Sequence, residues 1–196
     1  MKRSPFFAHL SRLRWIKRWG LMRNAYEENV MEHGWEVAVI AHALAVIRSR
    51  VFHRPVDAHR VAAVALFHDV SEAITGDLPT PIKYHSQAIR NAYRDLEARA
   101  TRELLAVLPE ELKPDFAETM LPESIPEEIQ ALVKAADRLA GYLKCKAELR
   151  AGNQEFIHAA QEIEEKIRQL DLPEVNYFLE VFVPSYDLTL DRLLIE

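Results

Sequence analysis

The sequence predicts an all-α protein that forms a single multi-helix domain. Apolar residues recur at helical spacing in several long segments, and Ser, Asn or Asp stands before a number of them as a cap. No segment shows the alternation of a half-buried strand, and no internal repeat or low-complexity linker divides the chain. Because 196 residues suffice for one large domain, we expect one helical domain over residues 1–196.

The composition narrows the class of protein. The formal net charge is −5, which argues against general binding of nucleic-acid polymers. No run approaches the roughly 18 consecutive apolar residues of a membrane span, and the basic N-terminus lacks the apolar core of a secretory signal. The single cysteine, Cys145, suits a reducing compartment, so we expect a cytoplasmic protein.

The first 26 residues carry seven Lys or Arg and no acidic residue. Such a basic segment can attract anions. A solvated helix face is the ordinary alternative for most of these side chains. Arg18 is the sharpest candidate for an anion contact, because its planar guanidinium can hold a phosphate through two hydrogen bonds.

Start signals mark three helices in the first half of the chain. A Ser-Pro pair at positions 4–5 opens the first helix. Asn29 caps the second, with Glu32 as its capping-box partner, and Asp57 caps the third. We therefore expect helices over residues 5–17, 30–50 and 58–73.

The second half begins with a rigid loop. TGDLPTP, residues 75–81, holds one glycine and two prolines in seven residues and is not expected to be helical. An amphipathic helix then fits residues 86–108, and we expect its inward residues to be Ile89, Tyr93, Leu96, Leu104 and Leu108. Proline-bearing connections with one short helix lead to further helices over residues 126–150, 155–169 and 174–182.

Polar side chains fall on the apolar faces of three of these helices. His33 lies on the inward face of its helix, His68 follows Val61 by seven residues, and Asp137 follows Val133 by four. An unpaired buried carboxylate costs several kcal/mol or more. Imidazoles and carboxylates that converge on a divalent cation avoid that cost, and they suit Mn, Co, Fe, Zn or Mg.

Glu72 follows His68 by four residues, which places it one turn later on the same predicted helix face. A carboxylate there can orient or deprotonate an attacking water. Each residue alone has an ordinary alternative: a satisfied core histidine, an aspartate paired with arginine, or a solvated glutamate at a helix end. Their combination on three helices favours a metal site.

Three sequence blocks resemble the signature of HD-domain metal-dependent phosphohydrolases: ENVMEHGWEVAVIAHAL, ALFHDVSEAITGDLPTP and VKAADRLAGYLKC. The N-terminal RWGLMRN, the GDLPTPIKY loop and the terminal YFLEVFVPSYDLTLD resemble the bacterial 5′-deoxynucleotidases within that superfamily. The resemblance spans nearly the full chain. It implies an HD-domain helical bundle with a metal site between helices and a core at about residues 28–145. The N-terminal helix (5–17) and the C-terminal helices (155–182) would pack on that core.

By that resemblance, four residues would bind the metal: His33, His68, Asp69 and Asp137. Glu72 would be the catalytic carboxylate, and Arg18 would orient the phosphate. The implied substrate-binding residues are Arg18, Trp19, Asp69, Asp77, Leu78, Pro79, Thr80 and Asp137. HD proteins with two or three metals use further histidines between the two aspartate ligands, where this chain has only His85. We therefore expect one divalent ion, such as Co or Mn.

The function implied by the resemblance is hydrolysis of deoxyribonucleoside 5′-monophosphates to deoxynucleoside and phosphate, by a cytoplasmic homodimer with no nucleic-acid polymer or membrane partner. Two alternatives stay open. One is another HD phosphohydrolase, such as a cyclic-nucleotide or alarmone hydrolase. The other is a non-catalytic helical module that binds a metal or a partner protein.

Overall fold

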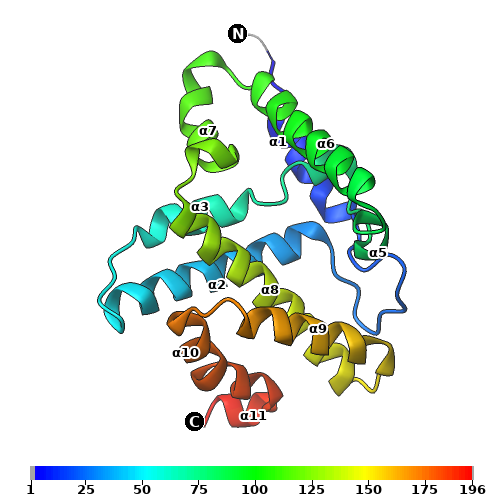
Figure 1. Cartoon of the computed structure of the whole chain (residues 1–196), viewed down its shortest axis with the longest axis vertical. Helices are drawn as coiled ribbons and strands as arrows, with labels where there is room; N and C mark the ends of the chain where they lie inside the picture. The colour runs from blue at the N-terminus through cyan, green and yellow to red at the C-terminus, as the bar shows by residue number, and fades with distance from the viewer. Residues whose placement is uncertain (1–2, 196) are drawn as a thin grey trace.

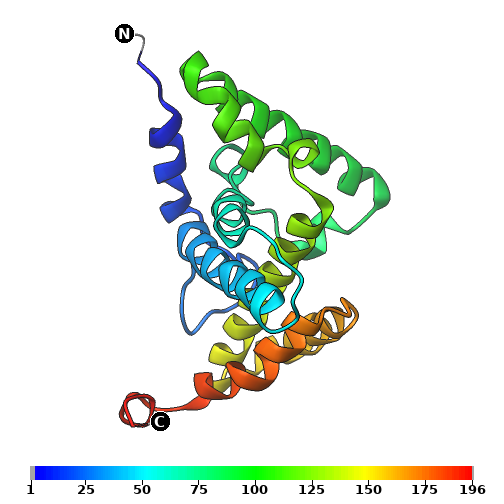
Figure 2. The ribbon, with the colours of Figure 1, turned by 90° about the vertical axis from the view of Figure 1, so that its left-hand side faces the viewer.

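A computed structural model describes residues 3–195 and confirms the all-α prediction. Within these residues, the only β pairing is an isolated antiparallel bridge between Lys17 and Asn29. The centre of the molecule is built from α2 (Val30–Arg50), α3 (Ala58–Leu66) and α8 (Glu127–Arg150), which pack against one another (Figure 1). The two ends of the chain lie at opposite ends of the long axis (Figures 1 and 2).

The N-terminal helix is shorter than predicted. α1 (Phe6–Leu10) passes into a 3₁₀ helix, η1 (Ser11–Trp15), rather than continuing to residue 17. The chain then becomes extended and pairs with the residues before α2: the amide of Arg18 donates to the carbonyl of Glu28 at 3.0 Å. This pairing brings the basic N-terminal segment to the start of α2.

Helix α2 begins as predicted. The Asn29 side chain accepts from the Glu32 amide at 3.0 Å, and the Glu32 carboxylate accepts from the Asn29 amide at 3.2 Å, which completes the capping box. α2 is also long and apolar enough by composition to cross a bilayer, but half of its most apolar window is buried inside the molecule, as in the core helix of a globular domain.

Helix α3 corrects the expectation of a helix to residue 73. Asp57 caps it as predicted, but it ends at Leu66, and Glu72 opens a separate short helix, α4 (Glu72–Thr75). In a continuous helix the carbonyl of Ala65 would accept from the amide of residue 69. Instead it accepts from the amide of His68 at 3.3 Å and from the imidazole of His68 at 2.7 Å. This competition ends the regular helix, so His68 and Asp69 no longer follow its spacing.

The loop after α4 is partly helical, which corrects a second expectation. Pro79 and Pro81 flank the start of a one-turn helix, α5 (Thr80–Lys83). α6 (Gln87–Ala106) follows, capped by Ser86. Three of its predicted inward residues are buried, but Ile89 and Leu96 are 38% and 43% exposed. α6 covers the α4–α5 end of the molecule with only part of its apolar face (Figure 1).

The remaining helices confirm the predicted order, with one addition at the C-terminus. The predicted short helix is α7 (Lys113–Met120), and two further helices are α9 (Ile157–Arg168) and α10 (Pro173–Val181). The unpredicted one is α11 (Leu190–Leu193). Short 3₁₀ helices fill the connections: η2 (Glu110–Leu112), η3 (Pro122–Ser124), η4 (Gln154–Phe156) and η5 (Val183–Asp187).

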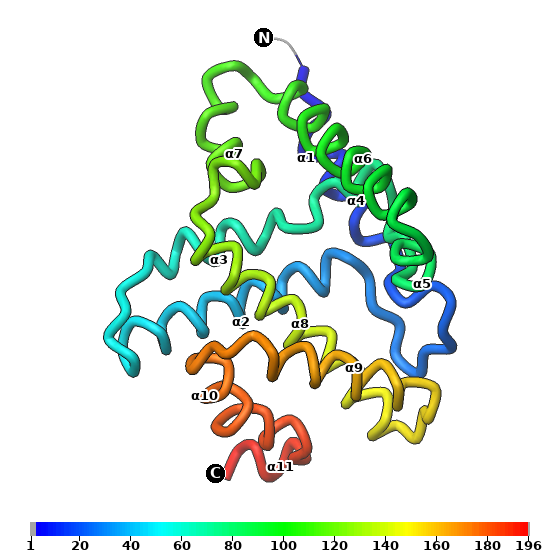
Figure 3. Tube along the Cα trace, viewed as in Figure 1, coloured from blue at the N-terminus to red at the C-terminus, as the bar shows by residue number. Residues whose placement is uncertain are grey.

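Two hydrophobic cores meet at the segment after α3. The larger core joins α2, α3 and α8 with α10, and it includes Ala65. The smaller core joins α1, α6 and α7, and it includes Val70 and Ala73. The chain therefore leaves one core and enters the other between Ala65 and Val70, and the tube view follows this crossing from α3 to α4 (Figure 3). His68 and Asp69 lie at that junction.

Candidate metal centre

Three of the four predicted ligands form one compact cluster. His33 comes from α2, and His68 and Asp69 come from the turn after α3; one ligand atom from each lies within 4.8 Å of the others. Asp137 approaches from α8, with its Oδ1 3.1 Å from Nε2 of His33. Its side chain is 43% exposed, more than an apolar helix face led us to expect. Three helical segments thus bring the four predicted side chains together.

The imidazoles are turned so that both Nε2 atoms face the cluster. Nδ1 of His68 donates to the Ala65 carbonyl, so Nε2 is the ring nitrogen that faces the cluster. That Nε2 is buried and makes no hydrogen bond within residues 3–195, yet it lies 3.0 Å from Oδ2 of Asp69. Nε2 of His33 lies 3.8 Å from the same oxygen. Imidazole nitrogens and a carboxylate oxygen directed at one point are a suitable ligand set for a divalent cation.

The charges within the cluster shift the pKa values of its histidine and aspartate side chains. Burial alone would lower the pKa of His68, but the charge of the adjacent Asp69 raises it to about 9. Burial would raise the pKa of Asp69, but His68, His33 and Arg18 hold it well below its ordinary value. The carboxylate therefore remains an anion beside two imidazoles, as a metal ligand must.

Glu72 lies beside this cluster at the start of α4. Its side chain is buried, and its Oε2 has no hydrogen-bond partner in the described part of the chain. Burial and the negative charges of Asp69 and Asp77 raise its pKa to about 9, against the opposing charges of Arg18 and His68. A buried, unpartnered carboxyl group with a strongly raised pKa is typical of a functional site.

Arg18 reaches the cluster from the N-terminal segment. Its Nη1 lies 3.5 Å from Oδ2 of Asp69, and its Nε lies 3.1 Å from Oε1 of Glu28. Burial would lower its pKa, but Asp69 and Glu28 raise it above the ordinary value. The guanidinium is therefore charged next to the predicted metal ligands.

Trp19 has an unusual backbone conformation. Its φ of 58° lies in the left-handed region, which a tryptophan rarely adopts. Its indole N–H donates to Oε2 of Glu28 at 3.2 Å, and its ring centroid lies 5.3 Å from that of Phe156. Backbone strain of this kind is concentrated at binding and active sites.

Glu28 is the residue that sequence reasoning missed. It contacts Arg18 and Trp19, and its Oε1 lies 3.3 Å from Nδ1 of His33. Burial would raise its pKa, but the neighbouring His33 and the charge of Arg18 lower it below the ordinary value. Glu28 stands in a non-helical segment directly before the Asn29 cap, so no helical periodicity marks it. The one available signal was its acidic side chain next to that cap.

The loop residues are less closely tied to the cluster. Burial raises the pKa of Asp77 against the charge of Arg18, so its carboxyl group lies in the same electrostatic environment. Leu78 and Pro79 are half-buried and Thr80 is exposed, and no hydrogen bond or ion pair in residues 3–195 links their side chains to the predicted ligands. The loop is anchored from α6 instead: the Tyr93 hydroxyl donates to the Gly76 carbonyl at 3.2 Å.

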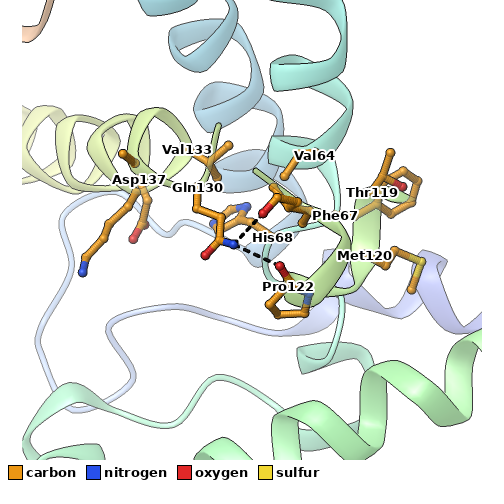
Figure 4. A pocket seen from close by; sticks show the side chains of 12 residues that line it. Val64, Phe67, His68, Thr119, Met120, Pro122, Gln130, Val133 and Asp137 are labelled. Carbon is orange, nitrogen blue, oxygen red and sulfur yellow. Dashed lines mark hydrogen bonds between the residues drawn. The ribbon is translucent and has the colours of Figure 1, made fainter. Parts of the chain in front are cut away.

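A pocket of about 380 Å³ opens on the His68–Asp137 side of the cluster. Its wall is mainly apolar and includes Phe67, Met120 and Val133, and Gln130 bonds to the carbonyls of Pro122 and Ile125 across it (Figure 4). Arg18, Trp19 and residues 77–80 are not among its lining residues. The predicted ligands therefore lie between this pocket and the Arg18 side.

Comparisons with known proteins agree with the geometry. The family model for "5′-deoxynucleotidase YfbR-like" matches residues 5–186. A 5′-deoxynucleotidase of Yersinia pestis (strain Pestoides F) is 51% identical over 190 residues, covering 97% of this chain and 96% of that protein. A 5′-deoxynucleotidase of Yersinia pseudotuberculosis (serotype O:3, strain YPIII) matches to the same extent.

Solved structures share the fold at lower identity. An HD-domain phosphohydrolase from Listeria innocua superposes with a TM-score of 0.81 at 23% identity, covering 92% of this chain and 87% of that chain. The HD phosphohydrolase of cyanophage S-2L, bound to dA and one catalytic Zn²⁺, has a TM-score of 0.66 at 22% identity and covers 94% and 99%. The solved structures show that this chain has the fold of HD-domain phosphohydrolases. The family match over nearly the whole chain, together with the relatives at 51% identity, shows that the chain belongs to the 5′-deoxynucleotidase YfbR-like family.

Proposed function

We propose that this chain is a metal-dependent 5′-deoxynucleotidase that hydrolyses deoxyribonucleoside 5′-monophosphates to deoxynucleoside and inorganic phosphate. The observation that carries the proposal is the convergence of the His33, His68 and Asp69 cluster with Arg18, which lies 3.5 Å from Asp69. A cation site beside a buried guanidinium suits a phosphomonoester dianion. The curated relatives at 51% identity carry the same activity in their names.

One divalent ion would be held by His33, His68, Asp69 and Asp137. Two imidazoles and two carboxylates suit Co or Mn as well as Zn. When bound, the cation supplies Lewis-acid chemistry: it draws charge from the phosphate and lowers the pKa of water and of the nearby Glu72 carboxyl group. The catalytic Zn²⁺ of the cyanophage relative supports a single-ion site.

The protein's own groups would bind and orient the reactants. Arg18 would hold the phosphate from the Asp69 side, where its Nη1 lies 3.5 Å from Oδ2 of Asp69. Glu72 would orient the attacking water and accept its proton, because it is the buried carboxyl group left without a partner among the described residues. Asp69 and Asp137 would lie against the bound substrate as well as the ion.

The nucleoside would lie between Trp19 and the Asp77–Thr80 loop. The half-buried indole is fixed on two sides, by Glu28 and by Phe156, so it can form a rigid wall against the sugar. Asp77 would accept a hydrogen bond from the 3′-hydroxyl, and Leu78, Pro79 and Thr80 would complete the wall. A stiff loop reduces the ordering entropy lost on binding.

The alternatives have less support. A cyclic-nucleotide or alarmone hydrolase with two or three metals would use more histidines than His85, which lies outside the cluster. A non-catalytic metal-binding module would have no use for a buried, unpartnered Glu72 or for the Arg18 pair with Asp69.

The enzyme would act as a homodimer in the cytoplasm. Helix α2 presents an apolar stripe to solvent: Met31, Trp35, Val39 and Val46 are 36%, 66%, 49% and 38% exposed. An exposed apolar stripe at spacings of four and seven residues along one helix is typical of an interface between protein chains. Sedimentation of the wild-type chain and of Trp35→Glu tests the dimer, which the charged variant should dissociate.

Phosphate release from a panel of deoxyribonucleoside and ribonucleoside 5′-monophosphates, with Mn, Co, Zn or Mg added to metal-free protein, tests the activity. We expect turnover that requires the metal and favours the deoxyribonucleotides. Equal rates on both sugars would remove the deoxy preference, and turnover in a chelator would remove the metal requirement.

A further inference from the structure

We propose that Glu28 is a positioning residue that holds the phosphate-binding arginine, the sugar-facing tryptophan and one metal-binding histidine in register with one another. This role deepens the proposed function and rests on it. The motivating observation is that one carboxylate lies against Arg18, Trp19 and His33 at once.

The backbone places Glu28 where it can do this. The bridge between Lys17 and Asn29, with the Arg18 amide on the Glu28 carbonyl, lays residues 16–18 beside the residues that precede α2. The side chain of Glu28 then lies next to Arg18 and Trp19 from one strand-like segment. His33 projects back toward it from the first turn of α2.

The contacts divide between the two carboxylate oxygens. Oε1 lies 3.1 Å from Nε of Arg18 and 3.3 Å from Nδ1 of His33, both within ion-pair distance. Oε2 accepts the indole N–H of Trp19 at 3.2 Å. The side chains of Glu28, Arg18 and His33 are 12%, 15% and 0% exposed, so these contacts are shielded from water.

Each contact acts on a different part of the site. With Nε held by Glu28, Arg18 keeps its Nη1 toward Asp69. A carboxylate on Nδ1 of His33 fixes the ring with Nε2 toward the other ligands and raises its basicity. The bond to the indole fixes Trp19 in its left-handed backbone conformation.

Glu28 is not needed to cap the helix that follows. Asn29 and Glu32 already satisfy the first amides of α2 through the capping box. The neighbouring Glu27 offers a matched control, because it is 71% exposed and, within residues 3–195, pairs only with Lys17. Its loss should change stability little, as for other surface ion pairs.

The experiment compares Glu28→Ala, Glu28→Gln and Glu27→Gln. Metal dissociation constants come from competition with a chromophoric chelator, and KM and kcat are measured separately on a deoxyribonucleotide and its ribonucleotide. Circular dichroism melts check folding. For Glu28→Ala we expect metal affinity to fall by about 10- to 100-fold. We also expect KM to rise, and the preference for deoxyribose to fall on the order of tenfold.

Glu28→Gln separates charge from hydrogen bonding. Its single amide oxygen can keep the place of Oε1 beside His33, but the ion pair with Arg18 is lost and the amide NH2 then faces the indole N–H of Trp19. We expect metal affinity to stay within about threefold of the wild type while KM rises several-fold and kcat changes less. If Glu28→Ala fails to fold, this variant still decides the question, since an unchanged KM would overturn the role.

Metal affinity, KM and sugar preference of a folded Glu28→Ala that all stay within about twofold of Glu27→Gln would overturn the proposal. If the wild-type chain released no phosphate from any nucleotide, the proposed function would fail instead. The metal affinities of Glu28→Ala and Glu27→Gln would then still decide whether Glu28 positions His33.

Discussion

Nε2 of His68 lies 3.0 Å from Oδ2 of Asp69, while Nδ1 of the same ring donates to the carbonyl of Ala65. In the neutral ring, Nε2 carries a lone pair that is directed at a carboxylate oxygen. Two acceptors at this distance repel each other unless a proton or a cation lies between them. The raised pKa of His68 indicates a proton at this place when no metal is bound, and a cation that also contacts His33 and Asp137 would take the place of that proton.

Replacing the Glu72 carboxyl group by an amide should stop turnover and leave metal and nucleotide binding intact. We expect Glu72→Gln to lower kcat by about 10²- to 10⁴-fold, because the amide cannot accept the proton of the attacking water. The side chain is not among the predicted ligands, so metal stoichiometry and nucleotide affinity, measured by calorimetry, should be retained. Undiminished turnover would assign the base role to another group.

Replacing Arg18 by lysine should weaken phosphate binding although the charge is kept. A lysine ammonium cannot pair with Glu28 and Asp69 while presenting a planar fork to the phosphate. We expect kcat/KM on deoxyribonucleotides to fall by about tenfold or more, equivalent to about 1.4 kcal/mol. Arg14→Lys, in the same basic segment but exposed, is the control; equal effects of both variants would mean that only general charge matters.

Local patterns predicted most of the helices and marked three of the four candidate ligands, whereas Asp69 was implied only by the family resemblance. Asn29 with Glu32 and Asp57 marked helix starts correctly, and the apolar spacing around His33 placed its imidazole in the core. The break after Leu66 was not predictable from periodicity, since VAAVALFHDVSEA reads as a continuous helix. It depends on the imidazole of His68 competing for a backbone carbonyl, which has no signal in a hydrophobic pattern.

The role suggested for Glu28 was likewise beyond the pattern. An acidic residue in a non-helical segment carries no period. Its contacts with Arg18 and Trp19 arise from pairing with residues nine and ten positions earlier, and the third contact comes from His33 in the helix that follows. The exposure of Ile89 and Leu96 has a similar cause, because α6 lies at the edge of the molecule with too few neighbours to cover its apolar face. All of these features depend on contacts between distant parts of the chain, which local sequence propensity does not predict.

The Tyr93 hydroxyl should affect substrate binding through the loop that it anchors. Its hydroxyl bonds to the Gly76 carbonyl and lies 3.4 Å from the Thr75 hydroxyl, so it ties α6 to the loop before Asp77. Tyr93→Phe removes a bond worth about 1 kcal/mol, and we expect KM to rise about fivefold with metal affinity unchanged. Tyr84→Phe, at an exposed ring, should leave KM at the wild-type value; a matching rise there would contradict the role of Tyr93.

Glu148 should govern stability in acid. It is fully buried and accepts from the amides of Ala25 and Tyr26, and, despite its burial, bonds from Lys144, from these amides and from Asn153 lower its pKa to about 2. Because the folded-state pKa lies below the unfolded one, its contribution is present above about pH 4.5 and is lost as pH falls toward 2.

We expect that loss to be on the order of 3 kcal/mol in the free energy of unfolding. Urea melts at pH 7 and at pH 3 should therefore show a smaller acid-induced decrease for Glu148→Gln than for the wild type. The exposed Glu103→Gln should keep the full decrease. An unaltered decrease in Glu148→Gln would show that other groups control acid unfolding.

Calorimetric titration of Mn²⁺ into metal-free protein tests the shared cation most directly. The four converging side chains predict one equivalent bound per chain in the wild type and a loss of that binding in His68→Ala, a variant whose folding can be checked by circular dichroism. Absence of binding in the wild type, or the same binding in His68→Ala, would contradict a metal centre at this junction.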